Sequence, residues 1–298
     1  MSRCMKGPIR CILTVAVAAF GAAAPAAAQA PPAVNVPPSR LPPPGVQEIA
    51  EHGGHLTWQD TLPDAQGRPT AVVLDRSGGT TVALPIAPVR DLDLGPGPGP
   101  GGRPTAVYTR CAPSCDIWRY DYAGGREQRV ASVSAPGIGE HLPTIWGQRI
   151  AFERRGSVIV RDLRAGRSQI VARRVFPDDI ELGAKHVAFV GLYERGEGNG
   201  TVELRLRGLA SGREQLLADG VIGEGASTGF GLLTFRGSTL FWQARRRNGC
   251  DVFAPAYARY DVRRGGRARP TPPEAAPPAV RAGAVVPPDT PESENCGP

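Results

Sequence analysis

The pattern that decides the fold reads Ile117-Trp118-Arg119-Tyr120-Asp121-Tyr122-Ala123-Gly124-Gly125-Arg126. It combines an apolar strand, a charged residue near the end of that strand and a Gly-centred turn followed by Arg. The same pattern returns at 158–167 and 204–213 and, in eroded form, at 258–267. Gly125, Gly166 and Gly212 are separated by 41 and 46 residues. Such a period, in copies with strand patterning, is typical of four-stranded β repeats and favours them over helical and leucine-rich arrays.

Further strand candidates lie between these copies and predict an all-β domain. Apolar runs rich in β-branched and aromatic residues occur at 71–74, 106–108, 150–152, 187–190 and 239–242. Shorter runs precede several of them, at 55–58, 144–146 and 231–234. No stretch shows the apolar spacing of an amphipathic helix. We predict a single β-propeller of five four-stranded blades, or alternatively six; a β-sandwich would give no reason for a constant repeat.

The two ends of the repeat region suggest how the ring closes. Residues 46–50 stand alone before the first unit, and the last unit lacks a clear fourth strand after Val262. Pairing the two segments would remove two exposed strand edges. The predicted propeller domain therefore spans residues 46–267.

Residues 1–28 are predicted to be an export signal. Arg3, Lys6 and Arg10 give a basic start, an apolar run extends from Cys11 to Phe20, and small residues precede Gln29. The run is about half of the ~20 residues that span a bilayer. We expect cleavage after Ala28, a secreted or periplasmic product and no membrane span. Residues 29–45 are predicted to be a Pro-rich linker and residues 268–298 a Pro-rich tail.

The charge composition gives no indication of a nucleic-acid partner. The chain has 35 Lys and Arg against 28 Asp and Glu, a formal net charge of +7. Part of this excess lies in the predicted signal, and the rest is dispersed along the chain. A nucleic-acid binder would show a basic face with interleaved aromatic residues.

Four cysteines follow the predicted signal and form a candidate disulfide set: Cys111, Cys115, Cys250 and Cys296. Cys115 and Cys250 open matching segments on the second and fifth units, which are not neighbours in a five-bladed ring. Disulfides need a Cα separation below roughly 7 Å. We therefore predict the pairs Cys111–Cys115 and Cys250–Cys296. A Cys4 zinc site is the alternative, but the chain lacks a second short-spaced pair.

Recurring Asp and Gly residues are interpreted as turn residues. Asp121, Asp162 and Asp261 each stand four residues before a Gly, and the full set of predicted turn residues is Asp121, Gly125, Asp162, Gly166, Gly212, Asp261 and Gly265. The carboxylate would accept amide hydrogens of the turn, and Gly would take the positive φ that the hairpin needs. Calcium binding is the alternative, but calcium needs oxygens that converge on one point.

Candidate sites for chemistry are few. His52 and His55 form a His-x-x-His pair, which is a weak metal motif, and Gly53-Gly54 between them indicates a turn. Trp58, Trp146 and Trp242 are expected to pack between blades. The sequence has no G-x-S-x-G, H-E-x-x-H or P-loop motif. We expect no metal and no cofactor, and we lean towards a protein that is not an enzyme.

The stretch 142–152, followed by Val160-Arg161-Asp162-Leu163, resembles the TolB-type and WD40-like propeller repeats of exported bacterial proteins. The resemblance covers residues 50 to 267 and departs from the TolB pattern by lacking a Ser-Pro-Asp-Gly turn. It implies a propeller fold and a role in binding. It carries no catalytic residue across.

Two functions follow as hypotheses. The first is an exported, monomeric, non-catalytic propeller that binds a protein or a cell-envelope component through its faces. The alternative is a propeller enzyme that acts on a carbohydrate or a lactone through its central funnel. A convergent acidic set in the funnel would favour the enzyme, and an apolar or Arg-dominated funnel would favour the binding protein.

Overall fold

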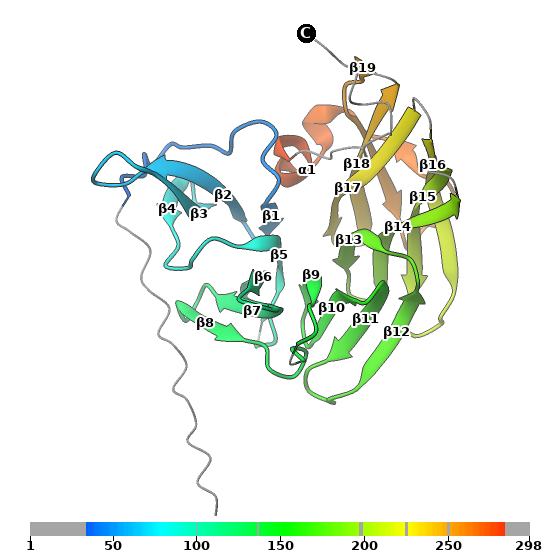
Figure 1. Ribbon diagram of the computed structural model, residues 1–298, viewed down its shortest axis with the longest axis horizontal. Helices are drawn as coiled ribbons and strands as arrows, with labels where there is room; N and C mark the ends of the chain where they lie inside the picture. Colours follow the sequence, from blue (N-terminus) through cyan, green and yellow to red (C-terminus); the bar gives the residue numbers. More distant parts are fainter. Residues whose placement is uncertain are drawn as a thin grey trace, which may run out of the picture.

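The computed structural model describes residues 34–99, 101–135, 137–196, 199–223, 226–248 and 251–283. Within them the chain is almost entirely β-structure, arranged as five four-stranded units that follow one another around a central space (Figure 1). The predicted all-β class and the four-stranded repeat are confirmed.

The first three units are separate antiparallel sheets. Unit 1 contains β1 (Ile49–His52), β2 (His55–Pro63), β3 (Pro69–Ser77) and β4 (Thr80–Ala83). Unit 2 contains β5 (Arg90–Pro96), β6 (Pro104–Cys111), β7 (Cys115–Asp121) and β8 (Arg126–Arg129). Unit 3 contains β9 (His141–Trp146), β10 (Arg149–Arg154), β11 (Ser157–Asp162) and β12 (Ser168–Arg173).

Units 4 and 5 have longer strands and belong to one continuous sheet. Unit 4 contains β13 (Pro177–Leu182), β14 (His186–Gly196), β15 (Asn199–Gly208) and β16 (Glu214–Gly223). Unit 5 contains β17 (Ala226–Arg236), β18 (Thr239–Asn248), β20 (Ala256–Asp261) and β21 (Arg269–Pro270), with β19 (Asp251–Val252) beside β18. The tips of β16 and β17 pair at Ile222–Ser227 and Gly223–Ala226, which joins the two units.

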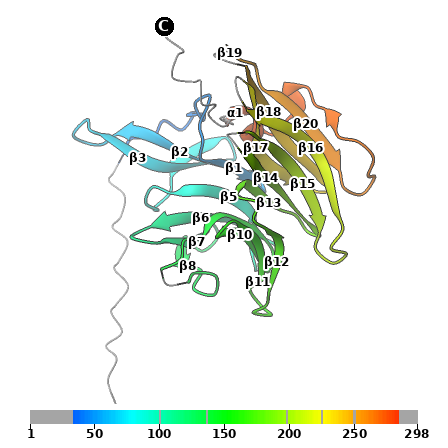
Figure 2. The ribbon, with the colours of Figure 1, turned by 45° about the vertical axis from the view of Figure 1, so that its right-hand side comes forward.

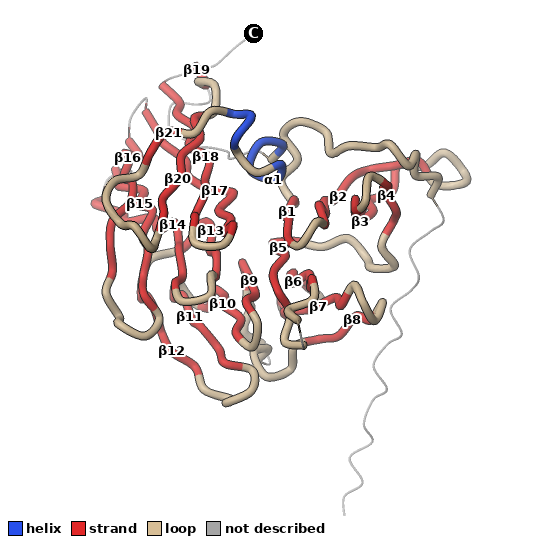
Figure 3. Tube along the Cα trace, turned by 180° about the vertical axis from the view of Figure 1, so that it is seen from behind, coloured by secondary structure: helices blue, strands red, loops and turns tan. Residues whose placement is uncertain are grey.

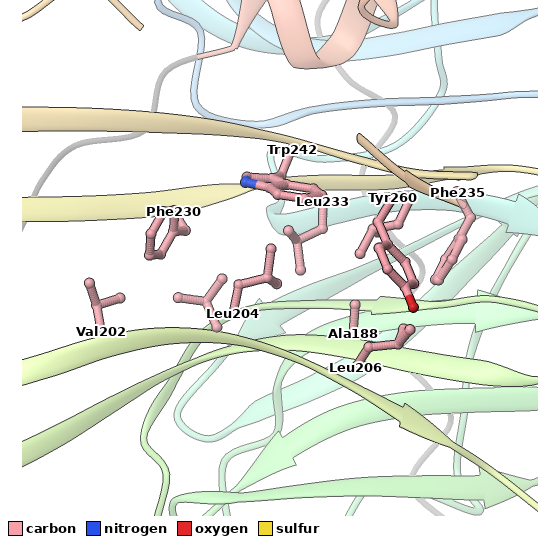
Figure 4. Packing of buried hydrophobic residues seen from close by; sticks show 11 residues of the cluster. Ala188, Val202, Leu204, Leu206, Phe230, Leu233, Phe235, Trp242 and Tyr260 are labelled. Atoms are coloured by element: carbon pink, nitrogen blue, oxygen red, sulfur yellow. The ribbon is translucent and has the colours of Figure 1, made fainter. Parts of the chain in front are cut away.

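Hydrophobic cores lie between consecutive units. The largest contains Val202, Leu204 and Leu206 of β15 facing Phe230 and other side chains of unit 5 (Figure 4). Corresponding clusters join units 1 and 2, units 2 and 3, and units 3 and 4. Because each unit buries a face against the next, no unit forms a complete core by itself. The packing orders the units in space as they are ordered in sequence (Figure 2).

The closure predicted for residues 46–50 is wrong. Ile49 and Ala50 belong to β1, which pairs with β2 as the first strand of unit 1. The fourth strand of unit 5 is β21, which pairs with β20. The prediction failed because it began unit 1 at His55 and so took its second strand for its first. Among the described residues no strand of unit 1 pairs with a strand of unit 5.

The last described segment of the chain lies between units 1 and 5. The 3-10 helix η1 (Pro273–Ala275) leads to α1 (Pro278–Ala282), which contacts β1, β17 and β18 (Figure 3). Ala279 of α1 packs in a cluster with Trp58 of β2 and with Val34 and Val36 from the N-terminal segment. The domain therefore extends to Gly283, beyond the predicted boundary at Arg267.

The described part of the predicted Pro-rich linker also packs on the domain. Arg40 forms an ion pair with Asp60 at 2.7 Å, and Thr81 donates its backbone N–H to Pro38. Gly45 donates its N–H to Ala282 of α1. Apolar Val34 and Val36 explain this docking, since they give an otherwise Pro-rich stretch a surface to bury.

Candidate functional site

A central cavity is lined by the first strands of all five units. Its volume is about 340 Å³, and β1, β5, β9, β13 and β17 together with Ala279 of α1 form its wall. Because one strand from each repeat contributes, the repeat itself creates the cavity. Such a meeting point of repeats is where propellers place their central funnel.

Acidic side chains converge on this cavity. No basic side chain is among its described lining residues, and its acidic members are Glu48, Glu51, Asp91, Asp93, Asp178, Asp179 and Glu181. The sequence analysis did not identify these residues. The signal was present as period-2 alternation of acidic and apolar residues, in Asp91-Leu92-Asp93-Leu94 and Asp179-Ile180-Glu181-Leu182.

Irregular backbone directs side chains into the cavity. Asp91, Leu142 and Leu232 have φ values of 53°, 50° and 53°, the left-handed region that residues other than glycine rarely adopt. Each lies on the wall of the cavity, beside a break in the pairing register of β5, β9 or β17. Bulges of this kind re-aim side chains and concentrate near functional sites.

Most of the acidic side chains also connect neighbouring units. Glu48 accepts the backbone N–H of Leu92 at 2.9 Å, and Asp93 accepts that of Ile145 at 3.2 Å. Asp179 accepts the N–H of Leu233 at 3.0 Å. Each bond satisfies a donor on the inner edge of the next unit, which no neighbouring strand pairs. The carboxylates therefore have a structural role in addition to any chemical one.

Three side chains form the most buried part of the set. The Thr144 hydroxyl donates to Glu181 Oε2 at 3.1 Å, and its oxygen accepts the N–H of Leu182 at 3.1 Å. Glu181 Oε1 accepts the N–H of Phe235 at 2.9 Å. Glu181 is only 5% exposed. Asp93, on β5 of unit 2, lies close to both Thr144 and Glu181.

Burial and mutual repulsion favour the protonated forms of these carboxyl groups. Burial raises the pKa of Asp93 to about 6, against hydrogen bonds that lower it. Burial, with the nearby Asp178 and Asp93, raises the pKa of Asp179 to about 7. Burial and the charge of Asp93 raise the pKa of Glu181 well above its usual range. Asp93 and Asp179 therefore change protonation near neutral pH.

The predicted His-x-x-His pair lies in the hairpin between β1 and β2. His52 and His55 pair across the Gly53-Gly54 turn. His55 Nδ1 contacts Asp75 Oδ2 at 2.9 Å, while the His52 ring lies edge-on to Trp146 at 5.9 Å. Within the described ranges no group of three or more His, Cys, Asp or Glu side chains has an arrangement that could hold a metal ion.

The predicted turn residues lie on outer hairpins, away from the cavity. Asp121 accepts the N–H of Ala123, Asp162 accepts those of Arg164 and Ala165, and Asp261 accepts those of Arg263 and Arg264. The accompanying glycines have positive φ: Gly125 at 58°, and Gly166, Gly212 and Gly265 at 66°. These bonds belong to turn geometry, and the three carboxylates do not converge.

A further copy of the turn pattern escaped the sequence analysis. Asp75-Arg76-Ser77-Gly78-Gly79 repeats the spacing of Asp121 to Gly125. Here the strand continues to Ser77, and Gly78 and Gly79, with φ of 56° and 86°, make a tighter turn. Asp75 is consequently buried and accepts the Thr57 hydroxyl at 2.8 Å.

The cysteines and tryptophans have structural surroundings. Cys111 and Cys115 form the predicted disulfide, with Cα atoms 3.8 Å apart at the tip of β6 and β7. The predicted pair Cys250–Cys296 lies outside the described residues. Trp58 and Trp242 are buried in hydrophobic clusters, and Trp146 is partly buried against two of them.

Comparisons with known proteins give no functional assignment. No family model matches the sequence, and no curated protein is significantly similar to it. Among solved structures, a puromycin-hydrolyzing peptidase of Mycobacterium tuberculosis is 14% identical with a TM-score of 0.44, over 75% of this chain and 40% of that one. The tricorn protease is 11% identical with a TM-score of 0.43, over 88% and 26%. The β-propeller domain of the Trilobed protease from Pyrococcus furiosus is 8% identical with a TM-score of 0.39, over 76% and 84%.

The chain thus spans less than half the length of the first two structures. Similarities this low carry no argument about activity.

Proposed function

We propose that this protein is a propeller-type hydrolase that acts on a carbohydrate or a lactone in its central acidic cavity. The observation that carries the proposal is the convergence of Asp93, Asp179 and Glu181, with the pKa raised to about 6 for Asp93, to about 7 for Asp179 and well above its usual range for Glu181. The sequence analysis leaned towards a non-catalytic protein and named an acidic funnel as the feature that would favour an enzyme.

The proposed chemistry uses two carboxyl groups in different protonation states. Asp179, with a pKa of about 7, donates a proton to the leaving oxygen as the bond to carbon breaks. Asp93, with a pKa of about 6, accepts a proton from the attacking water molecule. Hydrolysis then balances, because water supplies the hydroxyl to one product and a proton to the set. General acids and bases work best when their pKa lies near the working pH.

Activity should have a narrow, bell-shaped pH dependence. Asp179, the acid, is protonated below its pKa of about 7. Asp93, the base, is ionised above its pKa of about 6. The two apparent values belong to the coupled set of carboxyl groups. A panel of chromogenic glycosides and lactones, assayed from pH 4 to 9, should give an optimum between the two values.

The test must separate chemistry from the bonds between units. Asp179→Asn and Asp93→Asn keep an oxygen that accepts the N–H of Leu233 or Ile145 but cannot exchange a proton at neutral pH. Each should retain the melting temperature within a few degrees and lose about 100-fold or more in kcat. Asp179→Ala should lose both activity and stability. Full activity in Asp179→Asn would overturn the assignment of the acid.

A second candidate is the non-catalytic protein that binds a protein or a cell-envelope component. The observation that favours it is that Asp93, Asp179 and Glu181 each already accept a backbone N–H of the next unit. Under this hypothesis no substrate of the panel is hydrolysed, and envelope material captured by the wild type is also captured by Asp93→Asn. The Asn variants therefore distinguish the two functions.

Export is part of both proposals. The disulfide Cys111–Cys115 is compatible with an extracytoplasmic protein. Across the described ranges no helix has the length and apolar character needed to cross a membrane. Cleavage after Ala28 would be checked by the intact mass of the exported protein.

A further inference from the structure

A second cavity, open to solvent, lies between units 3 and 4. Most of its lining side chains are exposed, and its charge is opposite to that of the central cavity. Its volume is about 590 Å³, within the ~300–1,000 Å³ range of small-molecule sites. Three basic side chains line it: Arg149 at the start of β10, Arg167 after the turn that follows β11, and Lys185 in the turn between β13 and β14.

These cations are not neutralised by the protein. Arg149 donates to the backbone oxygen of Ala184 at 3.1 Å, a neutral acceptor. Among the described residues no carboxylate forms an ion pair with Arg149, Arg167 or Lys185. Asp162 is the acidic residue at the cavity, and its Oδ1 is held by the turn amides of Arg164 and Ala165. The cavity therefore has a positive excess available to a ligand.

The rest of the wall favours a ligand with an organic part. Val160, Leu209 and the methyl groups of Ala184 and Ala210 provide an apolar surface beside the cations. Ser168 and Gln169 add hydroxyl and amide groups. The volume far exceeds the ~30 Å³ of a water-sized anion site. A ligand with one anionic group and a small polar organic part, such as a phosphorylated sugar, matches a wall that has cations on one side and apolar and polar groups beside them.

We propose that this cavity binds an organic phosphate monoester, with the phosphate held by Arg149, Arg167 and Lys185. Guanidinium groups offer paired N–H donors that match phosphate oxygens, and an ammonium group adds a point charge. The site lies where the ends of β10 and β11 and the turn to β12 in unit 3 face the β13–β14 turn and the residues after β15 in unit 4. None of the central carboxyl groups lines it, so its ligand is not the proposed substrate of the central cavity.

Binding is measured by calorimetry with glucose 6-phosphate as the probe, and with glucose and inorganic phosphate as separate arms. Glucose 6-phosphate should bind more tightly than inorganic phosphate, glucose should not bind, and affinity should fall as salt is added. Arg167→Gln and Lys185→Gln should each weaken binding by about tenfold. Arg164→Gln is the matched control, because Arg164 lies in the same exposed turn but does not line the cavity.

Lys185 supplies an independent readout on the unmodified protein. The sequence contains two lysines, Lys6 and Lys185, so acylation of Lys185 can be followed by peptide mapping. Glucose 6-phosphate should slow acylation of Lys185 severalfold, and glucose should not. Absence of both binding and protection would overturn the proposal. If inorganic phosphate binds as tightly as glucose 6-phosphate, the proposal that the cavity recognises the organic part of the ligand is wrong. If the protein binds only to phosphatidic acid vesicles, the ligand is a membrane surface and not a soluble phosphate monoester.

Discussion

At the scale of single residues, Gly95 is a place where β5 of unit 2 packs tightly against β9 of unit 3. A Cβ atom added at Gly95 would lie 1.9 Å from the backbone oxygen of Ile145 on β9. Backbone cannot yield as a flexible side chain can, so Gly95→Ala should force β5 and β9 apart. We expect a loss of about 3 kcal/mol or more in the free energy of unfolding.

The control for this prediction is Gly99→Ala, since a Cβ at Gly99 would have no neighbour within 4 Å. Chemical denaturation of both variants gives the comparison. Similar stabilities for Gly95→Ala and Gly99→Ala would contradict the close packing of the two inner strands.

Asp75 and Asp121 show how one sequence pattern acquires two roles. Asp75 is 3% exposed and binds both Thr57 and His55, whereas Asp121 lies in an exposed turn. Asp75→Ala leaves buried polar partners unsatisfied and should cost about 2–4 kcal/mol of unfolding free energy, against about 1 kcal/mol or less for Asp121→Ala. Thermal melts of the two variants give the comparison, and equal losses of stability would contradict the structural role of the buried Asp75.

At the scale of elements, the acidic inner strands should make stability depend on pH. The folded pKa values of Asp93 and Asp179, about 6 and about 7, lie above the usual Asp value near 3.8. The folded state therefore binds protons more readily than the unfolded chain. The resulting stabilisation is complete below about pH 4 and is lost as the pH rises through 6 and 7.

The melting temperature should accordingly fall between pH 5 and pH 8. The double variant Asp93→Asn with Asp179→Asn should show a smaller fall, because an amide does not ionise while it keeps the N–H bonds to Ile145 and Leu233. A fall of the same size in the double variant would assign the pH dependence to other groups.

The turns of this fold could be predicted from the sequence, whereas the contacts between its units could not. The turns were predictable because Asp-to-Gly spacing acts locally, through bonds such as those of Asp162 to its own turn amides. The bond from Asp93 to Ile145 spans 52 residues and depends on the order of units in space, so no local pattern reveals it. Unit 1 was misassigned for a related reason: the sequence marks residues 46–50 as a separate segment, but it does not show that this segment pairs with β2 rather than with unit 5.

At the scale of the whole molecule, α1 and the contacts of Glu51 hold units 1 and 5 together. Glu51 of β1 forms an ion pair with Arg236 of β17 and accepts the N–H of Ala279 in α1 at 3.0 Å. Gln243 of β18 donates its side-chain amide to the backbone oxygen of Val280 at 3.1 Å. The five-residue helix α1 thus joins units 1 and 5, where the sequence analysis predicted a strand shared by the two units.

Val280→Asp should therefore destabilise the molecule strongly, because Val280 is only 1% exposed and faces this junction. We expect a loss of about 3 kcal/mol or more. Arg281→Asp introduces the same side chain at the exposed neighbouring position and should change stability by less than about 1 kcal/mol. Equal melting temperatures for the two variants would show that α1 does not hold the junction.

The hairpin shared by β16 and β17 has a consequence for how the molecule opens. Unit 4 cannot separate from unit 5 without breaking the bonds at Ile222–Ser227 and exposing the side chains between Val202 and Phe230. Among the described residues, the strands of units 1, 2 and 3 do not pair with a strand of another unit. In native-state amide exchange, β14, β15, β17 and β18 should therefore lose protection together, as one cooperative block, while β2 and β6 exchange independently and earlier.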